Sequence, residues 1–253
     1  MVKRARTPAG IVLVDKPAGP SSFALVAGLR RRTGARTGHA GTLDPFATGL
    51  LVLLSGAATS LAGCFVGLDK QYVTEIDLTA TTSTGDLQGE VAEEHEPPAQ
   101  SELEARLARL RGEVELPIPA VSAVKIGGER AYRLARRGVS VEMPLRRSQV
   151  YALDVIASSG RSVQLGLHVS SGTYVRAIAV ALGGHCLTLR RTAVGPFTVE
   201  EADADRLIPA SAALARLPES ALDRVSDSVA ASVVALEEPG VVRLGPTQPA
   251  TRT

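Results

Sequence analysis

The sequence predicts an α+β fold in which helices flank a mixed, largely antiparallel sheet. Residues 150–157 and 162–169 read as strands, and only the short stretch 158–161 separates them, which is typical of a β-hairpin. Residues 70–79 alternate between inward and outward positions, as a strand does. Segments with helical spacing are interspersed with these strands, and at 253 residues the chain is long enough for a sizeable core.

The first quarter of the chain predicts a strand, a helix and a second apolar segment. Residues 11–14 form a short apolar run. The sequence Asp-Lys-Pro ends this run, which favours a strand. Ser22 is expected to cap a helix that ends near Gly34. Its last turn carries Arg30–Arg32, which either complement the helix dipole or face phosphates. Residues 50–54 fit a strand or a buried helix, and periodicity does not decide between them.

The rest of the chain predicts three more helices. Ser101–Glu104 has the capping-box pattern, and the leucines at 103, 107 and 110 follow on one face before Gly112. A short basic helix is expected over residues 131–137 and another helix over 174–182. The sequence contains no internal repeat.

Charge is distributed unevenly along the chain. Residues 1–199 contain 23 basic and 17 acidic side chains, whereas residues 200–253 contain 5 basic and 9 acidic ones. The first part is therefore the expected partner of a polyanion. Arginine makes up 24 of the 28 basic residues and suits bidentate phosphate contacts, although a GC-rich genome also favours arginine.

Composition also excludes several classes of protein. Cys64 and Cys186 lie far apart without a C-x-x-C partner, so neither a disulfide framework nor a zinc site is expected. Spaced sets of His, Cys and carboxylate ligands are missing, and we expect no metal. No apolar run has the length of a signal peptide core or a membrane span, so a cytoplasmic protein without membrane association is expected.

The stretch Gly38–Gly49, GHAGTLDPFATG, concentrates glycines, a histidine and a carboxylate. We expect Asp44 on a tight turn as the N-cap of a helix that begins at Pro45, with its carboxylate presented outward. An Asp before Pro, taken alone, is most often only a cap. The stretch lacks the G-K-[ST] ending of a phosphate-binding P-loop, which disfavours nucleotide hydrolysis.

This stretch resembles the catalytic motif G-H-x-G-T-L-D-P-x-A-x-G of the TruB-type bacterial tRNA pseudouridine-55 synthases. Further motifs follow in that family's order over about residues 10–198: GIVLVDKP at 10–17, KQY at 70–72, TGDLQG at 84–89, SAVKIGG at 122–128, GTYVR at 172–176 and LRRT at 189–192. The resemblance implies a pseudouridine-synthase catalytic fold over residues 1–199.

The resemblance also implies which residues carry the reaction. Pseudouridine formation breaks the C1′–N1 bond of uridine, turns the base and joins C5 to C1′, so it needs neither a redox cofactor nor a metal. Asp44 would act as nucleophile or stabilise charge on the sugar. Arg176 would pair with Asp44 and keep it ionised, and Tyr72 would stack on the base and move a proton. The choice between a glycal intermediate and attack on the base stays open.

The target uridine is stacked in the T-loop and must be extruded before it reacts. The resemblance implies that His39 fills the vacated space. The other substrate contacts that it implies are Lys16 and Pro17 at the pocket floor, Tyr174 and Leu189 at its walls, and Asp86 as an orienting group, an acid–base group or a turn cap.

A thumb-like segment, residues 116–147, is the expected RNA contact. Its part from residue 125 to residue 147 carries seven basic and two acidic side chains, which favours phosphate contacts over the alternative of a solvated helix face. The expected RNA-binding residues are Lys125, Arg130, Arg133, Arg136, Arg137 and Arg146.

The chain departs from the family pattern in three places. Residues 183–188 are shorter than the corresponding stretch, and Leu116 and Val121 replace a usual Gln and a usual aromatic residue. Residues 200–253 are short and acidic where the family carries a PUA-type RNA-binding domain, so we expect a truncated or divergent remnant of that domain.

The sequence therefore predicts a monomeric tRNA pseudouridine synthase that acts without a cofactor on uridine 55 of the T-arm stem-loop. The alternative is a non-catalytic tRNA-binding or RNA-folding protein on the same scaffold. The intact Asp44, Tyr72 and Arg176 argue against that alternative.

Overall fold

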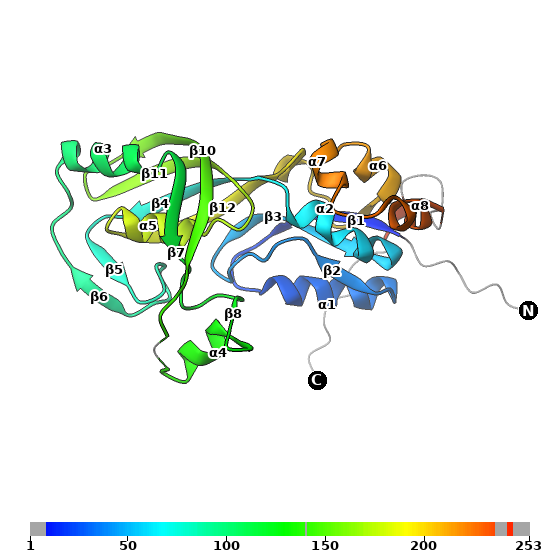
Figure 1. Cartoon of the computed structure of the whole chain (residues 1–253), viewed down its shortest axis with the longest axis horizontal. Helices are drawn as coiled ribbons and strands as arrows, with labels where there is room; N and C mark the ends of the chain where they lie inside the picture. Colours follow the sequence, from blue (N-terminus) through cyan, green and yellow to red (C-terminus); the bar gives the residue numbers. More distant parts are fainter. Residues whose placement is uncertain (1–8, 140, 236–241, 245–253) are drawn as a thin grey trace, which may run out of the picture. The chain divides into compact units, whose positions relative to one another are not determined.

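The computed structural model describes residues 9–139, 141–235 and 242–244, and the chain divides into two compact units (Figure 1). Unit 1 contains residues 1–68 and 191–253, and unit 2 contains residues 69–190. The described part of residues 200–253 belongs to unit 1 rather than standing alone. The expected division into a catalytic domain and a PUA-like remnant at residue 199 stays a prediction.

The sheet of unit 1 is built around two long apolar strands. Strand β1 (Gly10–Lys16) pairs antiparallel with β3 (Thr48–Ser55), from Gly10 opposite Ser55 to Lys16 opposite Gly49. The order is β15-β14-β1-β3-β12, with β2 on β3 and β13 on β12. The remaining strands are β2 (Thr37–His39), β12 (His185–Val194), β13 (Phe197–Thr198), β14 (Arg206–Pro209) and β15 (Val242–Arg243). The strand predicted at 11–14 is confirmed, and residues 50–54 form a strand.

Helices cover both faces of this sheet, which explains why residues 50–54 lack a polar face. Helix α1 (Ser22–Thr33) packs Val26 and Leu29 against Val12, Leu51 and Leu53. Figure 1 shows the other helices on the opposite face, over the alternate positions of β1 and β3. They are η1 (Gly56–Leu61), α2 (Ala62–Val66), α6 (Ala210–Leu214), α7 (Glu219–Leu222) and α8 (Asp227–Ala235); a single turn, η2 (Val199–Glu201), follows β13.

Unit 2 is an antiparallel sheet of order β12-β4-β11-β10-β7. The predicted hairpin is confirmed as β10 (Leu145–Ser158) with β11 (Ser162–Val169), and the predicted strand at 70–79 as β4 (Lys70–Asp77). The other elements are β5 (Ala80–Thr82), β6 (Val91–Glu94), α3 (Gln100–Arg109), β7 (Gly112–Pro117), β8 (Lys125–Ile126), β9 (Glu129–Arg130), α4 (Ala131–Arg136) and α5 (Val175–Ala181). Figure 1 shows β8 and α4 beyond the ends of β7 and β10, away from α3.

Three sequence predictions about helix ends are wrong. Pro45 does not begin a helix: Ala47 N–H donates to the carbonyl of Asp44 at 3.1 Å in a single turn, and β3 begins at the next residue. Only three residues separate Asp44 from β3, which is too few for a helix. Helix α1 is capped by Ser21 rather than Ser22. Helix α3 begins at Gln100, so Ser101 lies inside it and makes no capping box.

Among the described residues, no helix is long and apolar enough to cross a membrane.

Gly49 is a position where unit 1 tolerates no side chain. Its φ is 102°, and a Cβ there would collide with the main chain of Arg191. We expect Gly49→Ala to lower the free energy of unfolding through a strained backbone, about 1–3 kcal/mol, and a steric clash, about 1–3 kcal/mol more. Urea denaturation would measure the loss.

Gly19→Ala is the matched control, because Gly19 has a φ of 104° with no atom within 4 Å of the added Cβ. It should cost only the backbone strain. Equal losses for the two variants would contradict the role given to the Arg191 main chain.

Candidate active site

The loop of residues 40–47, between β2 and β3, carries Asp44, and a buried lysine holds its second half. Lys16, at the end of β1, is fully buried. Its Nζ donates to the carbonyls of Pro17 at 2.9 Å, Pro45 at 3.1 Å and Ala47 at 2.6 Å. Because three carbonyls converge on one ammonium group, the backbone directly after Asp44 is fixed.

Two further side chains of unit 1 hold the first half of the same loop. Ser22 Oγ donates to the carbonyl of Leu43 at 3.0 Å and accepts from its N–H at 2.9 Å. The guanidinium of Arg191 donates to Leu50 at 2.7 Å, Gly41 at 3.2 Å and Thr42 at 3.5 Å, in each case to the carbonyl. The backbone on both sides of Asp44 is therefore anchored, while Asp44 itself remains half-buried.

The charge of Lys16 interacts with those of Asp44 and Arg191 in unit 1. Burial lowers the pKa of Lys16, attraction to Asp44 raises it, and repulsion from Arg191 lowers it further. A carboxylate near a buried ammonium group is suited to act as a nucleophile or to stabilise a developing positive charge.

His39 lies at the end of β2, five residues before Asp44. Burial, and secondarily the charge of Arg191, lower its pKa. Its Nδ1 is buried and has no hydrogen-bond partner among the described residues. The imidazole is therefore neutral at pH 7 and suited to stacking on an uncharged base.

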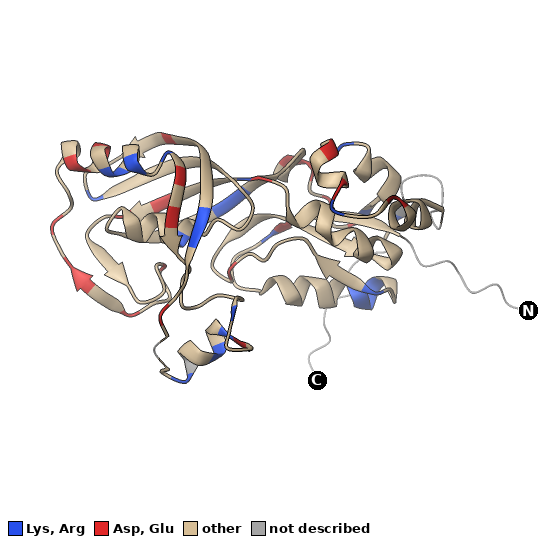
Figure 2. Ribbon diagram, in the orientation of Figure 1, with Lys and Arg blue, Asp and Glu red and all other residues tan. Residues whose placement is uncertain are grey.

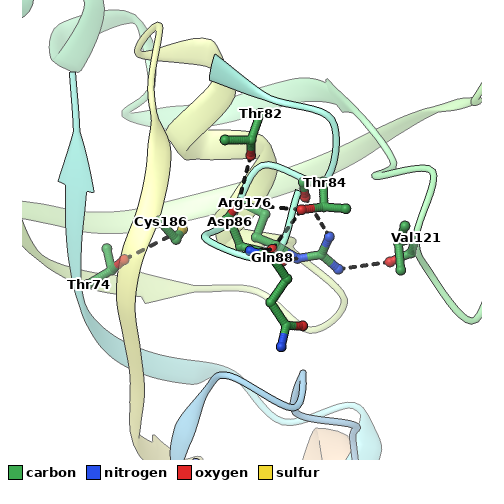
Figure 3. Close-up of polar contacts among 8 residues, drawn as sticks. All are labelled: Thr74, Thr82, Thr84, Asp86, Gln88, Val121, Arg176 and Cys186. Atoms are coloured by element: carbon green, nitrogen blue, oxygen red, sulfur yellow. Dashed lines mark hydrogen bonds and ion pairs between the residues drawn. The ribbon is translucent and has the colours of Figure 1, made fainter. Parts of the chain in front are cut away.

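In unit 2, the guanidinium of Arg176 connects three segments of irregular backbone (Figure 3). Arg176 is the second residue of α5 and is 2% exposed. Its Nη1 donates to the carbonyl of Thr84 at 2.7 Å, its Nη2 donates to the carbonyl of Val121 at 2.9 Å, and its Nε lies 3.6 Å from Oδ2 of Asp86. Val121 takes part through its main chain, so the departure from an aromatic residue there leaves this contact intact.

Asp86 is buried and is itself held in place. Its Oδ1 accepts from Thr84 Oγ1 at 2.6 Å and from the N–H of Gln88 at 2.9 Å, and its carbonyl accepts from Thr82 Oγ1 at 2.8 Å. The turn also pairs with the start of β12, where Cys186 N–H donates to Gly85 at 2.9 Å. These contacts are those of a turn cap and of a group that orients Arg176, and an acid–base role of Asp86 stays a prediction.

The shortened stretch 183–188 forms an abrupt return from α5 into β12. Gly183 has a φ of 85°, and β12 begins at His185. Arg106 of α3 donates to the carbonyl of Leu182, the last residue before this return, at 2.7 Å. The stretch is thus compact, with Cys186 and Thr188 in contact with Thr74 of β4.

The structure gathers the predicted site residues in two groups. Unit 1 contains His39, Asp44, Lys16 and Pro17, and unit 2 contains Tyr72, Asp86, Tyr174, Arg176 and Leu189. Tyr72 and Leu189 are buried on β4 and β12, and Tyr174 directly precedes α5. Lys16 and Arg176 have the supporting contacts given above. The pairing of Asp44 with Arg176 joins residues of different units and stays a prediction.

The basic side chains of the thumb-like segment differ in what they contact. Lys125 and Arg133 are exposed, and Arg133 lies 5.9 Å from the ring centre of Tyr132. Arg130 donates to the carbonyl of Ala123, and Arg137 forms a 2.8 Å ion pair with Glu129. Arg146 lies on β10 against Gly172. The side chain of Arg136 lies outside the described residues.

Sequence reasoning missed the roles of Ser22 and Arg191. Within the LRRT motif, Arg191 was assigned no role of its own from the sequence. In the structure, Arg191 is 1% exposed and donates a hydrogen bond to the Asp44 loop. The alternation of inward and outward positions along β12 could have indicated that Arg191 is buried, because Leu189, Arg191 and Ala193 all face inward. Ser22 was assigned to a helix cap, and nothing in the local pattern indicates its contact with Leu43.

Comparison with known proteins identifies the family. The model described as TruB family pseudouridylate synthase (N terminal domain) matches residues 30–175, more than half of the chain. The chain belongs to the TruB family of pseudouridylate synthases. This is a family of isomerases, and the predicted family and fold class are confirmed.

Individual relatives agree with this assignment. The chain is 44% identical to tRNA pseudouridine synthase B of Mycobacterium sp. (strain KMS) over 208 residues, covering 76% of this chain and 69% of the relative. It is 42% identical to tRNA pseudouridine synthase B of Leifsonia xyli subsp. xyli over 228 residues, covering 84% and 76%. The solved Cbf5-Nop10-Gar1 complex contains a chain with 27% identity and a TM-score of 0.58; the match covers 78% of this chain and about half, 53%, of that chain.

No group of three or more His, Cys, Asp or Glu side chains that could hold a metal ion occurs among the described residues.

Replacing the buried ammonium should loosen the Asp44 loop. We expect Lys16→Met to lower the free energy of unfolding by about 2–4 kcal/mol, because the carbonyls of Pro45 and Ala47 lose a buried donor. Amide hydrogen exchange at residues 43–47 should become faster in the variant. The control variant Lys125→Met removes an exposed lysine and should change the free energy of unfolding by less than about 0.5 kcal/mol. An equally small effect of Lys16→Met would show that the Lys16 ammonium does not hold the loop.

His39 should titrate below the ordinary histidine pKa of 6.5. Since the unfolded chain binds a proton there below about pH 6.5 while the folded chain does not, His39 makes the protein less stable as pH falls through this range. NMR titration of the imidazole in the free protein measures the pKa. His39→Asn should reduce the stability lost between about pH 7.5 and 5.5, and an imidazole pKa above 6.5 would contradict the prediction.

Proposed function

We propose that the chain isomerises uridine 55 in the T-loop of tRNA to pseudouridine, with Asp44 as the nucleophile. The observation that carries the proposal is the anchored loop of residues 40–47. Lys16, Ser22 and Arg191 fix its backbone on both sides of Asp44, and leave the carboxylate partly exposed. The names of the relatives, tRNA pseudouridine synthase B, support the substrate.

The proposed reaction uses this preorganised carboxylate. Asp44 approaches the target nucleotide in a fixed position, which removes the entropy cost of orienting the nucleophile. The C1′–N1 bond breaks, the base turns, C5 bonds to C1′, and the proton on C5 leaves while N1 gains one. The neutral imidazole of His39 fills the space that the extruded base leaves in the RNA stack.

Unit 2 supplies the groups that recognise the base and the charge. Arg176, held by Asp86 and the carbonyls of Thr84 and Val121, is a buried guanidinium with a defined orientation. We assign to it the partnership with Asp44 that the family resemblance implies. Tyr72 stacks on the uracil, and Leu189 and Tyr174 close the pocket around it.

RNA is held by the thumb-like segment through its exposed cations, Lys125 and Arg133, together with Arg130, Arg136, Arg137 and Arg146. These contacts position the T-arm without reading its sequence, so the fold of the T-loop and the flipped base select the target. The proposed enzyme is a monomer without a cofactor and acts in the cytoplasm on tRNA.

Asp44→Asn tests this function directly. The variant should form pseudouridine at least about a thousandfold more slowly, because the amide is no nucleophile, while it binds an unmodified T-arm hairpin within a few-fold of the wild type. Chemical mapping of pseudouridine at single-nucleotide resolution and filter binding measure the two quantities.

Asp154→Asn, an exposed change of the same kind on β10, is the control and should leave both unchanged. Normal turnover of Asp44→Asn would overturn the role of the carboxylate. Tight binding by the wild type without any product would instead identify a non-catalytic tRNA-binding protein.

A further inference from the structure

A cluster of arginines in unit 1 has no role in the proposed site. Residues 9–68 contain four arginines, and all of them lie in the seven residues from Arg30 to Arg36. Three of them occupy the last turn of α1, and Arg36 directly precedes β2. Figure 2 shows this basic cluster at the carboxyl-terminal end of α1.

Arg32 differs from the other three because it serves the packing of unit 1. Its Nη1 donates to the carbonyl of Ala204 at 2.9 Å, and its Nη2 forms a 2.5 Å ion pair with Asp205. These contacts fix the end of α1 to the turn before β14. Arg32 is accordingly only partly exposed.

Arg30, Arg31 and Arg36 are exposed, and none of the three has an ion pair or side-chain hydrogen bond among the described residues. The dipole of α1 accounts for these three arginines only in part. A helix end gains about 0.3–1 kcal/mol from a cation in its last turn, where Arg30 and Arg31 lie. The terminal carbonyls of Leu29 and Arg30 accept from Thr33 Oγ1 and Gly34 N–H at 2.9 Å each, and Arg36 lies beyond the helix.

Helix α1 and strand β2 both connect this cluster to the site. Ser22, the first residue of α1, bonds Leu43 of the Asp44 loop, and Arg30 follows Ser22 by eight residues, which is about 12 Å along the helix. The carbonyl of Arg36 accepts from Gly56 N–H at 2.8 Å, and β2 then pairs with β3 through His39 opposite Leu53. His39 follows Arg36 by three residues, which is about 10 Å along a strand. That distance equals the rise of about three nucleotides in one strand of a double helix. The cluster and the Asp44 loop belong to the same compact unit.

We propose that Arg30, Arg31 and Arg36 form a second phosphate-binding surface, which contacts the T-arm backbone within a few nucleotides of the reacting uridine. The proposal rests on the proposed function, because it takes RNA as the substrate. Three exposed guanidiniums without an ion pair in the described part of the chain suit a run of phosphates, since each presents a planar fork of donors. The surface holds the RNA against unit 1, as the thumb-like segment holds it against unit 2.

Salt dependence of RNA binding tests the surface without relying on catalysis. The variant Arg30→Gln/Arg31→Gln/Arg36→Gln should bind an unmodified T-arm hairpin more weakly than the wild type. The slope of log K against log salt should become shallower by about 2–3, because about 0.7–0.9 is lost for each phosphate contact. At saturating RNA, the single-turnover rate of pseudouridine formation should not change.

The control is Arg109→Gln/Arg161→Gln/Arg206→Gln, which removes the same charge from exposed positions outside the cluster. It should retain the wild-type slope on the hairpin. Equal slopes for the two triple variants would overturn the proposal, as would a loss seen only with full-length tRNA, which would move the contact beyond the T-arm. Wild-type binding without product would refute the proposed function while leaving this binding comparison valid.

Discussion

The candidate site depends on a buried ammonium group that takes the place of regular secondary structure. Residues 40–47 connect β2 to β3 without a helix or strand, so most of their backbone groups have no ladder partner. Lys16 is placed by β1 under this loop and satisfies the carbonyls that follow Asp44. Burying a charge costs several kcal/mol unless polar groups compensate it, and here three carbonyls and the Asp44 charge do so. The loop therefore needs the Lys16 ammonium as a donor, and the buried ammonium needs the carbonyls of the loop as acceptors.

Arg191 completes the same arrangement from the other side. Its guanidinium reaches the carbonyls of Gly41, Thr42 and Leu50, and its main chain lies where a side chain on Gly49 would fall. A guanidinium stays charged even when it is buried, and it presents several donors in fixed directions. The glycine at position 49 of the Asp44 motif is thus required by packing against β12.

Unit 2 uses the same device. Arg176 is almost fully buried, and its guanidinium joins the carbonyls of Thr84 and Val121 with the carboxylate of Asp86. Each of the three groups lies on irregular backbone next to a regular element. The two groups of site residues are therefore organised alike: a strand or helix supplies a buried cation, and the cation fixes loops that could not order themselves.

Much of this could be predicted from the sequence, and the limits have physical causes. The alternation of β4 and the hairpin β10–β11 are local patterns, and the structure confirms them. Residues 50–54 stayed ambiguous because helices cover both faces of β3, which removes the alternation. The helix expected at Pro45 fits local propensity. It does not fit the pairing of β1 with β3, which places Gly49 opposite Lys16 and so starts a strand directly after Ala47. The long-range contacts of Ser22 and Arg191 leave no trace in local spacing, and only the inward position of Arg191 on its strand pointed to burial.

The arginines of this chain fall into buried, ion-paired and exposed groups. This difference in surroundings explains how a chain with a net charge of only +2 can bind RNA. Arg176 and Arg191 are buried and organise backbone, so their charge is directed inward. Arg32 and Arg137 are neutralised by carboxylates. Cations that lack such partners remain available to phosphates. These cations, rather than the net charge of the whole chain, set the electrostatic field that an RNA meets. The acidic residues of the last 54 positions lower the net charge, but those that the structure describes form no ion pair with Arg30, Arg31 or Arg36.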